Sequence, residues 1–312
     1  MNIFRLIRSL ILCASMVSIL GCNSLPGMHN NGTDRTIPVW EQTASKGALK
    51  VNLLWAKPIA KGPLPTIIVH PGMLQNADDM RGVLIDLANQ GFLSVAIDYE
   101  RLIDGEWAES TMPLRKKHEI DFVMNQVIQN PWVDKLNIGL LGFSLGGAHS
   151  LKIAESNPLI KAVVVYYPMT DFVGWAKSFE NDLILSFIVN QIKSSYLDES
   201  TNHTNATHLD LVSKYSAINF TNKIQASVLV IHGDDDQIAP IKYSKTFVKS
   251  LQLSGNDRSK LMVINNGSHG FNFKRSEQSL NSWFTSLNWM SEHLRAVSQE
   301  NPVLVSTTKA VY

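Results

Sequence analysis

The sequence predicts an α/β protein in which a mostly parallel central β-sheet carries helices on both faces. Short apolar runs rich in β-branched residues alternate with amphipathic helical segments, which is the pattern of a buried parallel sheet. Several of these runs lead directly into turns that contain glycine, aspartate or histidine, as expected where ligands bind at the carboxyl ends of strands. Apolar residues make up 45% of the 312 residues, so the chain can bury a large core.

The first half of the expected domain shows clear element boundaries. A strand at 66–70 is bounded by Pro65 and by Pro71-Gly72, and a helix follows with Asn76 as its N-cap and Gly91 as its stop. A second strand covers 92–97, and an amphipathic helix over 114–129 ends before Pro131. A strand at 136–141 then runs into a glycine-rich turn and a helix at 145–156.

The second half repeats the alternation around one atypical segment. Strands are expected at 162–166, 227–231 and 261–264, and helices at 241–253 and 276–296. Residues 174–216 are expected to form a helical insertion over the site, or alternatively a surface excursion away from it. The expected domain covers 46–297, and residues 298–312 are expected to be a loose tail.

The N-terminus has the features of an export signal. Basic residues precede an apolar stretch of twelve residues, 9–20, which is too short for a membrane helix. The segment Ile19-Leu20-Gly21-Cys22 resembles the lipobox of bacterial lipoproteins, which implies a signal peptide over 1–21 and a lipid on Cys22. A flexible tether is expected over 22–45. The resemblance implies a protein held on a membrane of the bacterial cell envelope. Ordinary secretion with cleavage near the same place and an uncleaved anchor are the alternatives.

Charge and cysteine content exclude several classes of protein. The formal charge of +1 argues against an electrostatic nucleic-acid binder, so no nucleic-acid partner is expected. Two cysteines, Cys13 and Cys22, cannot form a disulfide framework or a thiolate zinc site. No cofactor and no metal are expected.

Ser144 is the expected nucleophile. It lies in Gly142-Phe-Ser-Leu-Gly146, which fits G-x-S-x-G and connects an expected strand to an expected helix. Such a tight turn presents the serine hydroxyl to an open cleft. A phosphate-binding loop is disfavoured because neither a following Lys-Ser/Thr pair nor G-x-G-x-x-G is present.

A serine nucleophile needs a base, and the base needs an acid that fixes its tautomer. Two later strands lead into His232-Gly-Asp-Asp-Asp-Gln-Ile-Ala-Pro240 and into Ser268-His-Gly-Phe271. With the serine turn, these segments resemble the α/β-hydrolase superfamily, and within it the dienelactone-hydrolase-like and prolyl-oligopeptidase-like branches. The resemblance covers roughly 48–296 and implies that Asp236 is the acid and His269 the base.

Other acids compete with Asp236 in the sequence. Asp234 and Asp235 are its neighbours, and Asp171 follows another strand, where some hydrolases place the acid. A metal site in the aspartate run is disfavoured, because three consecutive acids do not point at one ion. His232 is expected to brace the loop rather than to react.

Two backbone amides are expected to stabilise the oxyanion. One belongs to Leu145, directly after the nucleophile, and the other to the loop after the early strand. The similar loop of polyester-degrading relatives implies that Met73 is the second donor.

The sequence therefore predicts a serine hydrolase of small-molecule carboxylic esters. Aromatic residues near the strand ends are candidates for an acyl pocket, although core packing explains them equally well: Tyr166, Tyr167, Phe172, Trp175 and Phe271. Dienelactone hydrolases proper use a cysteine nucleophile, so their activity is not implied here. A prolyl-oligopeptidase-type peptidase and a non-catalytic binding lipoprotein are the alternatives; the former is disfavoured because no counterpart of the large substrate-restricting N-terminal domain is evident.

Overall fold

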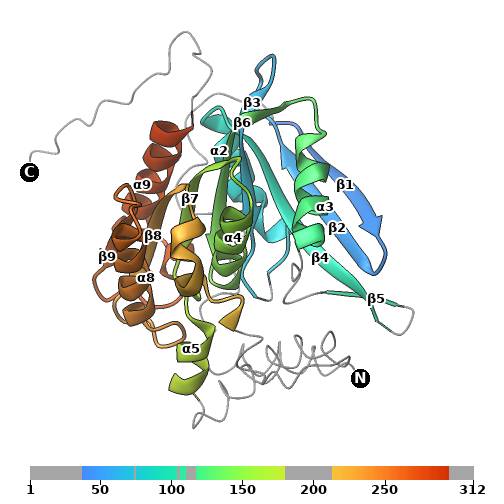
Figure 1. The fold of residues 1–312 in the computed structure, drawn as a ribbon. Helices are drawn as coiled ribbons and strands as arrows, with labels where there is room; N and C mark the ends of the chain where they lie inside the picture. The colour runs from blue at the N-terminus through green and yellow to red at the C-terminus, as the bar shows by residue number, and fades with distance from the viewer. Residues whose placement is uncertain (1–36, 74, 104–105, 110–116, 180–212, 295–312) are drawn as a thin grey trace, which may run out of the picture.

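A nine-stranded sheet forms the centre of the computed structural model, which describes residues 37–73, 75–103, 106–109, 117–179 and 213–294 (Figure 1). The strand order is β1-β2-β4-β3-β6-β7-β8-β9, and β5 pairs with β4. The strands are β1 (Val39–Lys46), β2 (Leu49–Ala56), β3 (Leu64–His70), β4 (Leu93–Ile103), β5 (Glu106–Glu109), β6 (Val133–Phe143), β7 (Ile160–Tyr166), β8 (Ser227–Gly233) and β9 (Lys260–Ile264).

Strands β3, β4, β6, β7, β8 and β9 are parallel to their neighbours, whereas β1, β2 and β5 join antiparallel. The residues of β3 and β8 are all buried, as expected for strands covered on both faces. The predicted mostly parallel sheet is confirmed.

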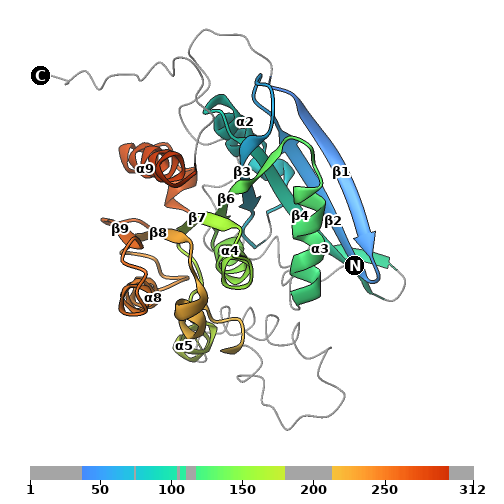
Figure 2. The same cartoon turned by 45° about the horizontal axis from the view of Figure 1, so that its top comes forward.

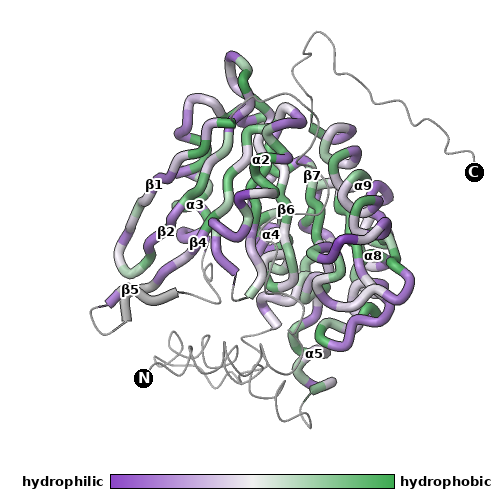
Figure 3. The backbone as a smooth tube through the Cα atoms, turned by 180° about the vertical axis from the view of Figure 1, so that it is seen from behind, coloured by the Kyte–Doolittle hydropathy of each residue, from purple (hydrophilic) through white to green (hydrophobic). Residues whose placement is uncertain are grey.

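Helices cover both faces of this sheet. Figure 2 shows α2 and α9 on one side and α3, α4 and α8 on the other. The helices are α2 (Arg81–Asn89), α3 (Lys117–Ile128), α4 (Leu145–Ser156), α5 (Phe172–Ser178), α8 (Ile241–Leu253) and α9 (Glu277–His293), with short 3₁₀ segments η1 (Asp78–Met80), η2 (Ala217–Lys223) and η3 (Phe271–Phe273). Each face has its own apolar core, and Figure 3 shows hydrophobic residues concentrated along the central strands.

Alternating strands and helices place every parallel strand in the same direction. The carboxyl ends of β6, β7, β8 and β9 therefore meet at one edge of the sheet, next to α5 in Figure 1. The loops that follow these ends can bring distant residues together.

The elements expected from the alternation are present, with ends shifted by a few residues. The prediction of a tether up to residue 45 is wrong in its last part, because 39–46 form β1. This strand makes a hairpin with β2 across Gly47, whose φ of 60° suits glycine. The half-exposed β1 lacks the long apolar run that marks the central strands.

Several predictions fall outside the described residues. They concern the signal peptide over 1–21, the lipid on Cys22, the first part of the tether, most of the insertion over 174–216, and the tail at 298–312. Of the insertion, the structure describes α5 and the approach to η2. Among described residues, no helix has the length and apolarity needed to cross a membrane.

Candidate active site

Ser144 occupies a strained turn between β6 and α4. Its φ is 52° and its ψ is −117°, which is unfavourable for a residue with a Cβ and costs about 1–3 kcal/mol. The amide of Ser144 donates a hydrogen bond to the carbonyl oxygen of Tyr166 at 2.9 Å. A Cβ on Gly146 would lie 2.2 Å from the carbonyl oxygens of His70 and Pro71, so only glycine allows this close approach of α4 to the end of β3.

His269 joins Ser144 to Asp236. Its Nε2 lies 2.9 Å from the Oγ of Ser144, and its Nδ1 lies 2.7 Å from an oxygen of Asp236. An ionised carboxylate can only accept, so Nδ1 carries a proton and Nε2 is free to accept the serine proton. The structure brings the three predicted residues together in hydrogen-bonding order.

The carboxylate of Asp236 is buried and held on both oxygens. Oδ1 accepts hydrogen bonds from the amides of Ile238 and Ala239 at 2.9 and 2.8 Å, while Oδ2 faces His269 and lies 3.3 Å from Nε2 of His232. Burial alone would raise the pKa of Asp236, but hydrogen bonds from His232 and His269, together with the charge of His269, hold it well below its usual value. Asp236 is therefore ionised at neutral pH.

His232 braces this loop, as expected. Its Nε2 donates to the carbonyl oxygen of Ala239 at 2.7 Å, and its Nδ1 accepts from the hydroxyl of Ser244 at 2.8 Å. The ring is fully buried between β8 and α8. Beside fixing the loop, it presents an N–H edge to Asp236.

The competing acids make other contacts. Asp171 caps α5 by accepting from the amide of Gly174, Asp234 accepts from the amide of Asn266, and the exposed Asp235 accepts from Gln237. None of these hydrogen bonds involves His269. The geometry therefore favours Asp236 over all three.

The predicted oxyanion donors belong to two segments next to Ser144, the start of α4 and the loop after β3. Leu145 is the first residue of α4, so its amide has no acceptor within the helix. Met73 belongs to the loop after β3, where a Cβ on the neighbouring Gly72 would lie 3.6 Å from the Cβ of Ser144. Among described residues, neither the Met73 nor the Leu145 amide donates to another group. Both can serve a developing oxyanion.

A side-chain bridge that the sequence did not indicate joins the two donor segments. Nδ1 of His70 lies 3.0 Å from Oγ of Ser150, and that hydroxyl donates to the carbonyl oxygen of Gly146 at 3.0 Å. Burial, and secondarily the nearby His149, lower the pKa of His70 to about 3, so the ring is neutral and donates from Nδ1. The bridge ties the end of β3 to the first turn of α4.

The candidate pocket aromatics are all buried, at 1–5% exposure. Tyr167 packs behind His269, with ring centroids 4.4 Å apart, and its hydroxyl donates to Asn272. Phe271 packs against Tyr166 and Tyr167. Only Phe172 and Trp175 join the apolar cluster that contains Leu145, and its partly exposed members are Met73, Phe179, Tyr215 and Tyr243.

Within the described ranges, no three His, Cys, Asp or Glu residues are grouped as a metal ion would require. The groups gathered around Ser144 supply a nucleophile, a base and an acid. That combination suits acyl transfer.

The sequence profile of the prolyl oligopeptidase family matches residues 83–296, which include all three members of the Ser144 array. The chain belongs to the prolyl oligopeptidase family. This family match and the α/β-hydrolase fold together support a hydrolase of that type.

Curated relatives of this family member act on different bonds. A probable 2-oxo-3-(5-oxofuran-2-ylidene)propanoate lactonase of Bradyrhizobium sp is 29% identical over 143 residues, covering 43% of this chain and 57% of the relative. Mouse mitochondrial acyl-coenzyme A thioesterase 2 is 27% identical over 237 residues, covering 75% of this chain and 49% of the relative. The chain thus spans about half the length of these relatives.

A solved structure supports the fold at lower identity. The acylaminoacyl peptidase of Pyrococcus horikoshii superposes with a TM-score of 0.64 at 16% identity, covering 86% of this chain and 44% of the peptidase. The names of these proteins include a lactone, a thioester and a peptide hydrolase. Which kind of bond this prolyl oligopeptidase family member cleaves must be argued from its own active site.

Proposed function

We propose that this family member is a serine hydrolase that cleaves carboxylic esters of small molecules through an acyl-enzyme intermediate. The observation that carries the proposal is the continuous hydrogen-bond chain from Ser144 through His269 to Asp236. No cofactor enters the reaction.

His269 starts the reaction by taking the Ser144 proton on Nε2 as the oxygen attacks the ester carbonyl carbon. The carbonyl oxygen becomes an oxyanion, which the amides of Met73 and Leu145 stabilise. The intermediate then collapses, the C–O bond to the alcohol breaks, and His269 gives its proton to the leaving oxygen. Water, deprotonated by His269, attacks the carbonyl carbon of the acyl-enzyme. The bond from that carbon to Oγ of Ser144 then breaks, the acid leaves, and His269 returns the proton to Oγ.

The apolar cluster that contains Leu145 and Met73 favours substrates with an apolar acyl group. Met73, Phe179, Tyr215 and Tyr243 are partly exposed members of this cluster, so an acyl chain can contact them next to Leu145. We assign Phe172 and Trp175 to the buried part of this cluster. Tyr167 packs on His269 instead, and Phe271 packs on Tyr167.

Labelling and turnover test this proposal. A fluorophosphonate should label the protein, and Ser144→Ala should abolish labelling; an unlabelled but folded wild type would favour the binding-protein alternative. Matched p-nitrophenyl esters, acyl-coenzyme A thioesters and peptide p-nitroanilides should then be compared. The highest kcat/KM is expected for esters, and turnover confined to peptides or thioesters would contradict the proposal.

We also propose that Cys22 carries the lipid that holds the protein on a membrane of the bacterial cell envelope. The support is the sequence Ile19-Leu20-Gly21-Cys22 after a short apolar stretch. Mass spectrometry of the mature N-terminus should find an acylated Cys22. An intact Met1 would contradict the anchor.

A further inference from the structure

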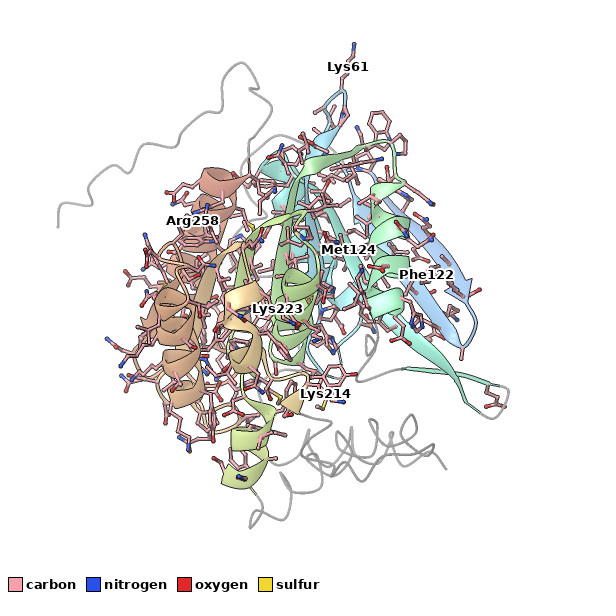
Figure 4. All side chains as sticks on the ribbon, in the orientation of Figure 1. Lys61, Phe122, Met124, Lys214, Lys223 and Arg258 are labelled. Carbon is pink, nitrogen blue, oxygen red and sulfur yellow. The ribbon has the colours of Figure 1, made fainter. Side chains whose placement is uncertain are left out.

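A second pocket lies at the end of the sheet remote from Ser144. It has a volume of about 460 Å³ and is lined by one proline and six other residues: Trp40, Gln42, Gln126, Gln129, Asn130 and Trp132. Trp132 directly precedes β6 and Ser144 directly follows it, so the eleven residues of this strand separate the two sites by on the order of 30 Å. In Figure 4, Lys61 marks this end of the molecule, opposite α5.

The two indole rings are held in place from behind. Trp40 stacks on the fully buried Trp55, with ring centroids 5.8 Å apart and planes 6° from parallel. The ammonium group of Lys57 lies 4.2 Å from the Trp132 ring and is itself fixed by the carbonyl oxygens of Pro58 and Ala60. Trp132 is 39% exposed, so part of its ring is open to a ligand.

The carboxamides between the rings have unused hydrogen-bonding capacity. Gln42 accepts from the Trp55 indole and Asn130 accepts from the Trp132 amide, which orients both side chains and leaves their NH₂ groups available. Within the described residues, the side chains of Gln126 and Gln129 make no hydrogen bond. The pocket lining therefore combines hydrogen-bond donors and acceptors with two aromatic side chains.

This combination matches one kind of ligand. The axial C–H groups of a sugar ring pack on the electron-rich face of an indole, while its hydroxyls pair with carboxamides. All residues that line the pocket are uncharged, and the adjacent Lys57 ammonium group already donates to the carbonyl oxygens of Pro58 and Ala60, so a charged ligand would lose hydration for little gain. A wholly apolar ligand would instead leave the amides unpaired. We propose that this pocket binds a neutral saccharide, at a site separate from the hydrolytic one.

The experiment is titration of the purified full chain with neutral gluco-, xylo- and chito-oligosaccharides, followed by calorimetry and ligand-observed NMR. At least one series should bind, and Trp132→Ala should weaken that binding about tenfold or more. Trp132→Phe should restore part of it. Phe284→Ala, which removes an exposed aromatic ring on α9, is the matched control and should leave binding unchanged.

Two further variants separate this site from folding and from hydrolysis. Gln129→Glu changes an exposed side chain and should weaken saccharide binding without lowering the melting temperature. The Ser144→Ala variant should bind saccharide as wild type does. Saccharide binding can therefore be tested whether or not the protein hydrolyses esters as proposed. The proposal is overturned if no series binds or if Trp132→Ala binds as well as wild type.

Discussion

Nε2 of His269 lies 2.9 Å from Oγ of Ser144, although 125 positions separate the two residues in the chain. Ser144 follows β6 and His269 follows β9, and parallel pairing through β7 and β8 brings the ends of both strands to one edge of the sheet. The contact therefore depends on the pairing of β6, β7, β8 and β9, on the left side of the sheet in Figure 1, rather than on local structure. The contribution of this contact to catalysis can be tested by substitution, beginning with the acid Asp236.

Asp236→Asn should lower kcat about 10³–10⁴-fold on the best ester. The amide that replaces the carboxylate can present N–H to Nδ1 of His269, which favours the tautomer that cannot accept the serine proton. Stopped-flow or steady-state ester hydrolysis measures the loss.

Asp235→Asn is the matched control, because the exposed Asp235 contacts Gln237 and makes no hydrogen bond to His269. Its kcat should stay within about twofold of wild type. Equal losses in the two variants would show that Asp236 is not the orienting acid.

Met73→Pro should reduce kcat about 10²–10³-fold, whereas Met73→Ala should change it little. Proline removes the amide hydrogen, and alanine keeps it while removing the side chain. Ester hydrolysis and affinity for a boronic acid, whose adduct with Ser144 places an oxygen at the oxyanion position, should fall together. If Met73→Ala is as damaging as Met73→Pro, the side chain rather than the amide matters.

Ser150→Ala should lower the free energy of unfolding by about 1–3 kcal/mol, because the buried Nδ1–H of His70 loses its acceptor. The same change should reduce kcat with little effect on KM, since the segments that carry Met73 and Leu145 lose their bridge. Urea unfolding and ester kinetics measure the two effects. Ser156→Ala is the matched control on α4, where the hydroxyl donates only to the carbonyl oxygen of Lys152; a similar loss in both variants would contradict the bridge.

The sequence predicted the parallel core and the three residues around Ser144 because each follows an apolar strand and precedes a turn with a recognisable residue pattern. It did not predict β1, whose alternate residues face solvent and whose run is not uniformly apolar. The His70–Ser150 bridge was also not predicted. Its members lie 80 positions apart, and neither residue belongs to a pattern that predicts its partner.

The sequence also did not predict which individual polar side chains are buried. Tyr167 was a candidate for the substrate pocket, but its ring packs against His269. Asp86 lies in an ordinary amphipathic helix, yet it is only 3% exposed. The burial of such side chains depends on how helices and loops pack against the sheet.

The burial of Asp86 makes the folded protein less stable as the pH rises. Burial in α2 raises the pKa of Asp86 to about 7, and within the described residues its carboxylate makes no hydrogen bond. Below about pH 4 the carboxyl is protonated in both the folded and the unfolded chain. Between about pH 4 and pH 7 the unfolded chain loses this proton and the folded chain keeps it, so the free energy of unfolding decreases, by up to about 4 kcal/mol.

Asp86→Asn removes this titration. Its free energy of unfolding minus that of wild type should therefore be about 2–4 kcal/mol larger at pH 8 than at pH 4. Comparing the two pH values cancels the constant cost of burying an amide in place of a neutral carboxyl. Urea unfolding of both proteins at each pH provides the four numbers, and Asp257→Asn, at an exposed position, should show no such difference. An Asp86→Asn effect that is the same at both pH values would mean that Asp86 ionises normally in the folded protein.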